Sequence, residues 1–279
     1  MSTIAIPALP AGRTLTLGIR RIGYEVKAYF RQGDAVFFGF LFPIVMLTIF
    51  SVAFSEGDFG TTADGTVVTA ADYYLPAMLA AGVLLSGLQN MALDIAAEKG
   101  DGTLKRLAGS PLPVISYFIG KIGQVLVSGV VQAALLLTLA ALAFRVELPS
   151  DPDRWATFAW VFLLGIATSA ILGIGLSSIP RSAKSANAVI IPIVLVLQFI
   201  SGVYLQFSAL PEWLQNVASV FPLKWMAQGM RAAFLPEEYR MLEAGEVWNL
   251  GGVAIALIVW LVVGLVLARV TFRWIRKDG

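Results

Sequence analysis

Six long apolar stretches constrain the fold of this chain more than any other feature of its sequence. Each is long enough for a helix that crosses the hydrocarbon core of a bilayer, which takes about 20 mostly apolar residues. The stretches run over residues 36–54, 73–93, 117–144, 155–179, 186–205 and 247–272. Apolar residues make up 58% of the chain, against roughly 45–50% in soluble domains. We therefore expect an all-α, multi-pass membrane protein with six transmembrane helices.

The positions of Lys and Arg predict which side of the membrane each loop faces. If the N-terminus is placed inside, most of the 20 Lys and Arg residues fall in segments on that same side. The first outer loop holds no Lys or Arg and carries four acidic residues, Glu56, Asp58, Asp64 and Asp72. Because Lys and Arg near span ends are retained in the cytoplasm, we expect a bacterial inner-membrane protein with both termini cytoplasmic.

The first 34 residues differ from the rest and are predicted to form a separate segment, 1–34, before a membrane domain over 35–279. They lack the short apolar core and the cleavage site of a signal peptide. Apolar residues recur at helical spacing at Leu15, Ile19, Ile22, Val26 and Tyr29, and the opposite face carries Arg20, Lys27 and Arg31. This pattern predicts an amphipathic helix on the inner membrane surface. The alternative is a tail that is basic only to fix the topology.

The composition excludes several kinds of site. The chain has no Cys and no His, so it offers no disulfide, thiolate or imidazole metal site. It has no G-x-x-x-x-G-K-[ST] loop to hold the phosphates of a nucleotide. Charged residues are nearly missing between the span ends, which disfavours a proton-coupled carrier or an ion channel. We expect no catalytic residue, no metal and no cofactor in this chain.

The loop after the second apolar stretch predicts a short helix that needs a partner. It begins near Thr103, the expected N-cap, and ends before Pro111. A helix of two turns is unstable alone, so it must dock against something. The alternative is an ordinary loop in which the Gly residues only turn the chain.

Two segments carry a resemblance to a known family, the ABC-2 type permeases of bacterial ATP-binding-cassette exporters. The loop is similar to the signature E-x-x-x-G-T-L-x-x-L-x-x-x-P-L, matched at Glu98, Gly102, Thr103, Leu104, Leu107, Pro111 and Leu112. Residues 210–231 look like the outer stretch L-P-x-W-L-Q followed by N-P-L and an Arg, with matches at Pro211, Trp213, Pro222 and Arg231. Phe221 replaces the usual Asn. The drug-resistance permeases typified by daunorubicin exporters are the most similar subfamily.

This resemblance implies a partner and a site. The segment between the second and third spans would be a coupling helix on a separate ATPase subunit, which binds ATP and Mg²⁺. The implied coupling residues are Glu98, Gly102, Thr103, Leu104, Arg106 and Leu107. A second permease copy, identical or homologous, and membrane lipids are the other expected partners, and no nucleic acid is expected. Residues 210–231 would form short helices in the outer leaflet, where aromatic anchors on an interfacial helix are an alternative interpretation.

The implied function is export of an amphipathic, drug-like or lipid-like substrate, driven by ATP that the separate subunit hydrolyses. The chain itself would not be an enzyme. Two alternatives remain open at this point. One is an exporter of a lipid-linked glycan or polymer with the same fold, and the other is a membrane scaffold that transports nothing and has no ATPase partner.

Overall fold

The computed structural model describes residues 10–57, 59–61, 65, 67–180 and 182–272. These residues form an α-helical protein with no β-strand among them, which confirms the predicted fold class. Asp58 and Asp64, which contribute to the predicted acidic outer loop, lie outside the described residues. The helices longer than one turn are α1 (Ala11–Phe30), α2 (Gly33–Ala53), α3 (Ala70–Leu84), η1 (Leu85–Asn90), α4 (Met91–Gly100), α5 (Thr103–Ala108), α6 (Val114–Ala143), α7 (Pro152–Leu176), α8 (Ala183–Ile200), α9 (Glu212–Val220), α10 (Pro222–Phe234) and α11 (Leu250–Thr271), with a short 3-10 segment η3 (Glu237–Leu242).

Five helical segments in the described part of the chain are long and apolar enough to cross a membrane. They are Val36–Ala53, Ala70–Gly100, Val114–Ala143, Pro152–Leu176 and Leu250–Thr271. The fifth predicted span, 186–205, coincides with α8, whose apolar part Lys184–Ile200 is shorter than the others. Five candidate spans are therefore established, and the six-span layout stays a prediction.

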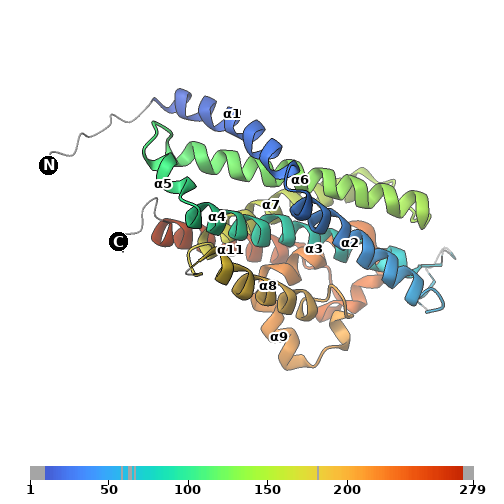
Figure 1. Cartoon of the computed structure of the whole chain (residues 1–279). Coiled ribbons are helices and arrows are strands. Elements are labelled where there is room, and N and C mark those ends of the chain that lie inside the picture. Colours follow the sequence, from blue (N-terminus) through green and yellow to red (C-terminus); the bar gives the residue numbers. More distant parts are fainter. Residues whose placement is uncertain (1–9, 58, 62–64, 66, 181, 273–279) are drawn as a thin grey trace.

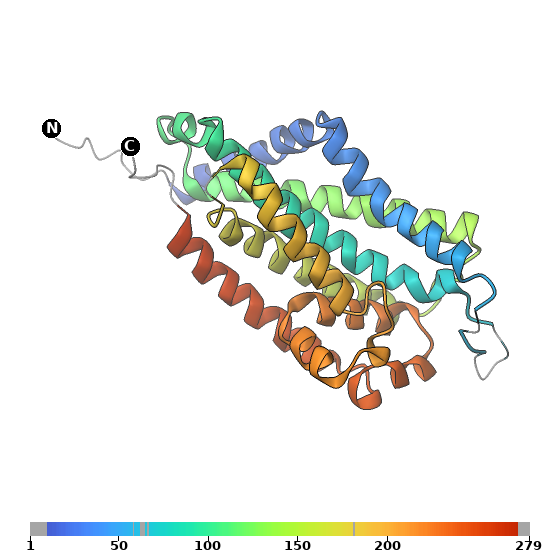
Figure 2. The ribbon, with the colours of Figure 1, turned by 60° about the horizontal axis from the view of Figure 1, so that its bottom comes forward.

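The second span is one continuous helix made of α3, η1 and α4, and it lies at the centre of the bundle (Figure 1). In the turned view of Figure 2, α2 and α8 lie on either side of this central helix. Nearly every residue of α3 is buried, whereas only 22% of the apolar window of α2 and 17% of that of α11 are buried. This contrast follows from composition, because α3 is rich in Ala and small residues that allow neighbours on all sides.

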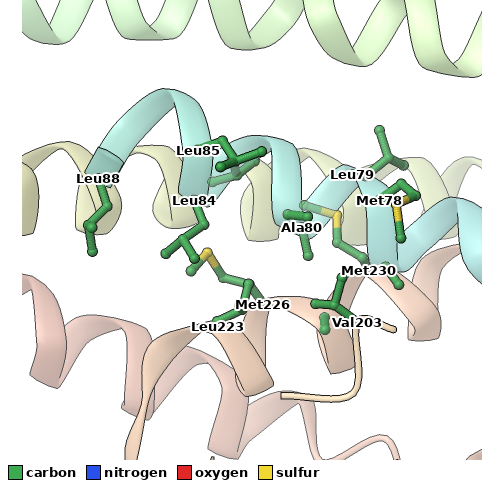
Figure 3. Packing of buried hydrophobic residues seen from close by; sticks show 14 of the residues in the cluster. Met78, Leu79, Ala80, Leu84, Leu85, Leu88, Val203, Leu223, Met226 and Met230 are labelled. Atoms are coloured by element: carbon green, nitrogen blue, oxygen red, sulfur yellow. The ribbon is translucent and has the colours of Figure 1, made fainter. Parts of the chain in front are cut away.

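The central helix touches α7 and α10 at close range. A Cβ atom added to Gly173 of α7 would lie 2.7 Å from the carbonyl oxygen of Gly87, so no larger side chain fits there without displacement. On another side, Met226 and Met230 of α10 pack against residues of the central helix such as Leu84 and Met78 (Figure 3). The small residues Ser169 and Gly173 of α7 thus allow this helix to approach the central helix closely.

The helix α1 confirms that the N-terminal segment is helical, and it packs along α6 (Figure 1). Two glycines of α6 permit this contact, because Cβ atoms at Gly120 and Gly123 would lie 2.7 Å from Arg21 and 2.5 Å from Ile22. The Ser116 hydroxyl donates to the Thr14 carbonyl at 2.7 Å. The apolar side chains of Leu15 and Ile19 remain exposed. The location of α1 at a membrane surface stays a prediction.

Candidate functional site

The loop that carries the motif folds as two short helical pieces joined by a sharp turn. Gly102 adopts φ +79°, a left-handed conformation that favours glycine, and α5 begins at the next residue. The prediction that Thr103 is the N-cap is wrong. The carboxylate of Asp101 accepts from the Thr103 backbone N–H at 2.8 Å, and the Thr103 hydroxyl accepts from Arg106 at 3.0 Å instead. The N-cap of α5 is Gly102, and the side chain of Asp101, two residues before Thr103, satisfies the first backbone N–H of the helix.

The two leucines of α5 hold this helix on the body of the protein. Leu104 is 1% exposed and belongs to the main apolar core, and Leu107 is partly buried against the same core. Lys105 and Arg106, on the other side, are exposed. Leu104 and Leu107 were predicted to present an apolar face to an ATPase subunit, whereas in this structure both pack inside the chain. The assignment of this helix to an ATPase interface stays a prediction.

Glu98, the first residue of the motif, lies inside a group of charges that we call the Lys121 cluster. The cluster consists of Arg21 and Glu25 of α1, Asp94 and Glu98 of α4, and Tyr117 and Lys121 of α6. The Lys121 ammonium contacts Asp94 and lies 2.7 Å from Glu98 and 2.9 Å from Glu25. The Tyr117 hydroxyl donates to Glu98 at 2.6 Å. Three helices therefore meet at one side chain.

The stoichiometry of the cluster explains why a buried lysine is tolerated. An ammonium group has three N–H donors, and Lys121, which is 1% exposed, meets three carboxylates. Their oxygens lie within 4.8 Å of one another, a spacing that a metal ion could also use, but the ammonium group lies among them. A buried charge is stable only when it is paired and hydrogen-bonded, as this one is.

Of the residues in the Lys121 cluster, Glu98 was predicted from the sequence as a site residue and the other five were not. Glu98 was predicted as a contact to a partner, and the structure shows it bonded inside its own chain. Asp94 and Glu98 lie four residues apart, so they share one face of α4, which was the available signal. Glu25 gave no such signal beyond its spacing of four from Arg21, 2.7 Å away. The predicted cations of α1, Arg20, Lys27 and Arg31, are exposed.

A second buried ion pair lies at the other end of the bundle, in the segment predicted for the outer leaflet. Arg231 of α10 is 3% exposed, contacts Glu243 through Nε and donates from Nη1 to the Gly202 carbonyl at 3.0 Å. Arg231 thereby links α10 to the connection before α9, which holds Gly202, and to the connection before α11, which holds Glu243. Arg231 is thus a structural anchor of this end rather than a solvent-facing group.

The other predicted outer residues have local roles. Pro211 precedes α9 and Pro222 is the first residue of α10, where a missing N–H costs nothing. Trp213 is exposed, as an aromatic anchor would be. Phe221 stands where the family pattern has Asn, and α10 accordingly has no side-chain cap, while the ring of Phe221 stacks on that of Trp260.

Lys224, one turn into α10, was not predicted as a site residue. Its ammonium lies 4.1 Å from the ring centroid of Trp225 and contacts the Gln228 side chain. Burial lowers the pKa of Lys224 to about 8. The Lys224 ammonium therefore interacts with aromatic and amide groups. The Glu243 carboxylate raises the pKa of Lys224, but by less than burial lowers it.

These features define a class: a multi-pass helical membrane protein with a short helix, α5, after its second candidate span and no G-x-x-x-x-G-K-[ST] loop in its sequence. The sequence profile of the family described as "ABC-2 family transporter protein" matches residues 59–270. The chain belongs to this family, as its two motifs indicated. Membrane subunits of this family carry no ATPase site of their own.

Named relatives agree with the family. The chain is similar to "Probable multidrug ABC transporter permease YbhR" of Escherichia coli K12, with 23% identity over 64% of this chain and 48% of the relative. It is also similar to "Inner membrane transport permease YadH" of the same strain, with 19% identity over 69% of this chain and 74% of the relative. The chain thus spans about half the length of the first relative.

Proposed function

We propose that this chain is the permease subunit of an ATP-driven exporter that moves an amphipathic, drug-like or lipid-like substrate out across the inner membrane. Membership of the family supports a membrane transport subunit with a separate ATPase. The names of two relatives, a probable multidrug permease and an inner-membrane transport permease, support the kind of cargo and the location. In this proposal two permease copies form the pathway and each binds one ATPase.

The single observation that carries the proposal is the anchored helix α5. Leu104 is buried in the core, so a force on α5 reaches the body of the protein instead of bending a loop. The Lys121 cluster extends this connection. It joins α4 to α1 and α6, and α4 ends two residues before Gly102. Closure of the ATPase pair would thereby move these helices as one rigid body.

Exchange of the two exposed cations of α5 tests the coupling role. We expect Lys105→Glu together with Arg106→Glu to reduce the ATPase that co-purifies with the permease by about tenfold, because two like-charge contacts replace two favourable ones at the rim of the interface. Both side chains are exposed, so the fold should not change. The measurement is the molar ratio of ATPase to permease after affinity purification from membranes.

The matched control is Arg240→Glu, an exposed arginine at the opposite end of the bundle. It should leave the ratio unchanged. If the double variant purified with as much ATPase as the parent, α5 would not be the coupling helix. If no ATPase purified with the parent chain, the proposed function itself would be wrong.

Thiol labelling tests the proposed orientation, with α5 inside and α10 outside. The chain has no cysteine, so single introduced cysteines report without background. In intact cells, an impermeant maleimide should label Glu238→Cys, which is exposed near α10, and should leave Lys105→Cys unlabelled until the cells are opened. Labelling of position 105 from outside would contradict both the orientation and the coupling role.

A further inference from the structure

A cavity of about 650 Å³ lies between α2, the η1–α4 part of the central helix and α8. Its volume is within the range of sites that bind small molecules. Apolar side chains form part of the wall, namely Phe38, Phe42, Leu85, Leu93, Ile191 and Leu195. An amphiphile could therefore place a chain along this wall, if the chain is a permease as proposed above.

The rest of the wall is unusually rich in amides for a membrane-embedded surface. The described lining includes Gln32, Gln89, Asn90, Gln124, Asn187 and Gln198, which come from the α1–α2 connection, η1, α6 and α8. Polar side chains within membrane helices are costly unless something satisfies them. So many amides around one cavity indicate a ligand with hydrogen-bonding groups rather than a purely apolar one.

Tyr29 and Asn90 form a polar pair in the wall of the cavity. The Asn90 side chain is the hydrogen-bonding neighbour of the Tyr29 hydroxyl, and both groups are buried. Both approach Gly39, where a Cβ atom would lie 2.9 Å from the hydroxyl and 3.5 Å from the Asn90 nitrogen. The pair adds polar side chains from α1 and η1 to the amide-rich wall.

The geometry of the central helix contributes a second, independent observation. Residues Leu85–Asn90 form a π-helical turn inside an otherwise α-helical span. The wider turn places two consecutive amides, Gln89 and Asn90, on the cavity wall. Such turns are rare and occur frequently at functional sites. The helix therefore departs from regular geometry at the point where it meets the cavity.

The charges in the wall indicate which head group fits. Among the described lining residues, Asp94 is the one carboxylate, and there is no Lys, Arg or His. Asp94 contacts the Lys121 ammonium, so a cationic ligand would have to compete with that lysine for it. An anionic ligand would find no cation in the wall. A neutral head group leaves no charge unpaired in a low-dielectric site.

We infer that this cavity binds the uncharged, hydrogen-bonding head group of an amphiphile, of the glycosyl, polyol or amide kind, with its apolar chain over Phe38, Phe42 and Leu195. Amide side chains both donate and accept, which suits hydroxyl and amide groups equally. The inference deepens the proposed function by naming the class of substrate. It makes no use of the ATPase.

Photolabelling of the chain in lipid nanodiscs tests this inference without detergent, whose own head groups would compete. Three probes share one acyl chain with a diazirine and differ only in the head group: glycerol, trimethylammonium or sulfate. The glycerol probe should label peptides of α8 and η1 at least about fivefold more than either charged probe. A diacyl glycolipid and a soluble alkyl glucoside, used as competitors, distinguish a bilayer lipid from a freely diffusing compound as the source.

Two nearly isosteric variants test whether the glycerol probe binds at the amide side chains of this cavity. Asn90→Leu and Asn187→Leu should each reduce labelling by the glycerol probe about five- to tenfold, because each removes a hydrogen bond from the bound head group. Asn187 is exposed to the cavity, so its loss should not disturb the core. The control is Thr138→Val on the exposed side of α6, which should change nothing.

The outcomes separate the inference from the proposed function. Equal labelling by the trimethylammonium probe, or unchanged labelling in both Asn variants, would overturn the neutral head group while the ATPase still co-purified. Loss of ATPase co-purification in the parent chain would overturn the permease role and would leave the labelling result standing.

Discussion

Replacing Lys121 by methionine is expected to lower the free energy of unfolding by about 3–5 kcal/mol, the typical cost of removing one partner from a buried ion pair. Methionine fills a similar volume, so the effect arises mainly from charge. Without the ammonium, Glu25, Asp94 and Glu98 face one another with Arg21 as the nearest described cation. The measurement is the unfolding midpoint in mixed micelles, followed by the fluorescence of the chain's tryptophans.

Two further variants separate charge from packing. Lys184→Met removes an exposed lysine at the start of α8 and should shift the midpoint little. Glu25→Gln combined with Lys121→Met removes one of the repelling carboxylates and should recover part of the loss. A Lys121→Met protein as stable as the parent would mean that the cluster does not hold α1, α4 and α6 together.

The variant Arg231→Met should be destabilised to a similar extent, by about 3–5 kcal/mol. It leaves the buried Glu243 carboxylate without its cation and frees the Gly202 carbonyl. Because these contacts join α10 to segments on both sides of it, we expect faster proteolysis in the connections around residues 202 and 243. The measurements are the unfolding midpoint and the cleavage pattern under limited proteolysis.

The chain offers a matched control for this second variant. Arg240 and Glu237 form an ion pair at 3.1 Å in which both side chains are more than half exposed. Such a pair contributes about 0–1 kcal/mol, so Arg240→Met should be nearly neutral. Combining Arg231→Met with Glu243→Gln should restore much of the stability, because no unpaired charge then remains buried. Equal losses in the two arginine variants would contradict a special role for Arg231.

The sequence predicted the helices well, because apolar length is a direct physical requirement for crossing a bilayer. It predicted α1 from its spacing and the short helix α5 from its flanking turn signals. It did not predict that residues 85–90 form a π-helical turn, where Gly87 lies in close contact with Ser169 of α7, because such tertiary contacts leave no periodic signal in the sequence. It misplaced the N-cap of α5 by one residue, because Thr103 is a good capping residue by type, whereas the left-handed conformation of Gly102 makes Gly102 the N-cap and Thr103 the first helical residue.

The candidate site was only partly predictable, for a reason that concerns burial. Glu98 and Arg231 were identified from motifs, but a motif says nothing about which side of a helix faces inward. The structure shows that both side chains pair inside the chain, Arg231 with Glu243 at a separation of 12 residues and Glu98 with Lys121 at a separation of 23 residues. The Lys121 ammonium also contacts Glu25. Long-range pairing of charges carries no local pattern, so Glu25 could not be foreseen.

The π-helical turn at Leu85–Asn90 has a practical consequence for scanning mutagenesis of the second span. A π-helical turn takes up more residues than an α-helical turn, which shifts the register on its two sides by on the order of one residue, about 100° of rotation. A helical wheel drawn through Ala70–Gly100 as a single α-helix therefore assigns the wrong face to one half. Accessibility data from this span should be fitted as two separate periodic segments, α3 and α4, with a phase break between them.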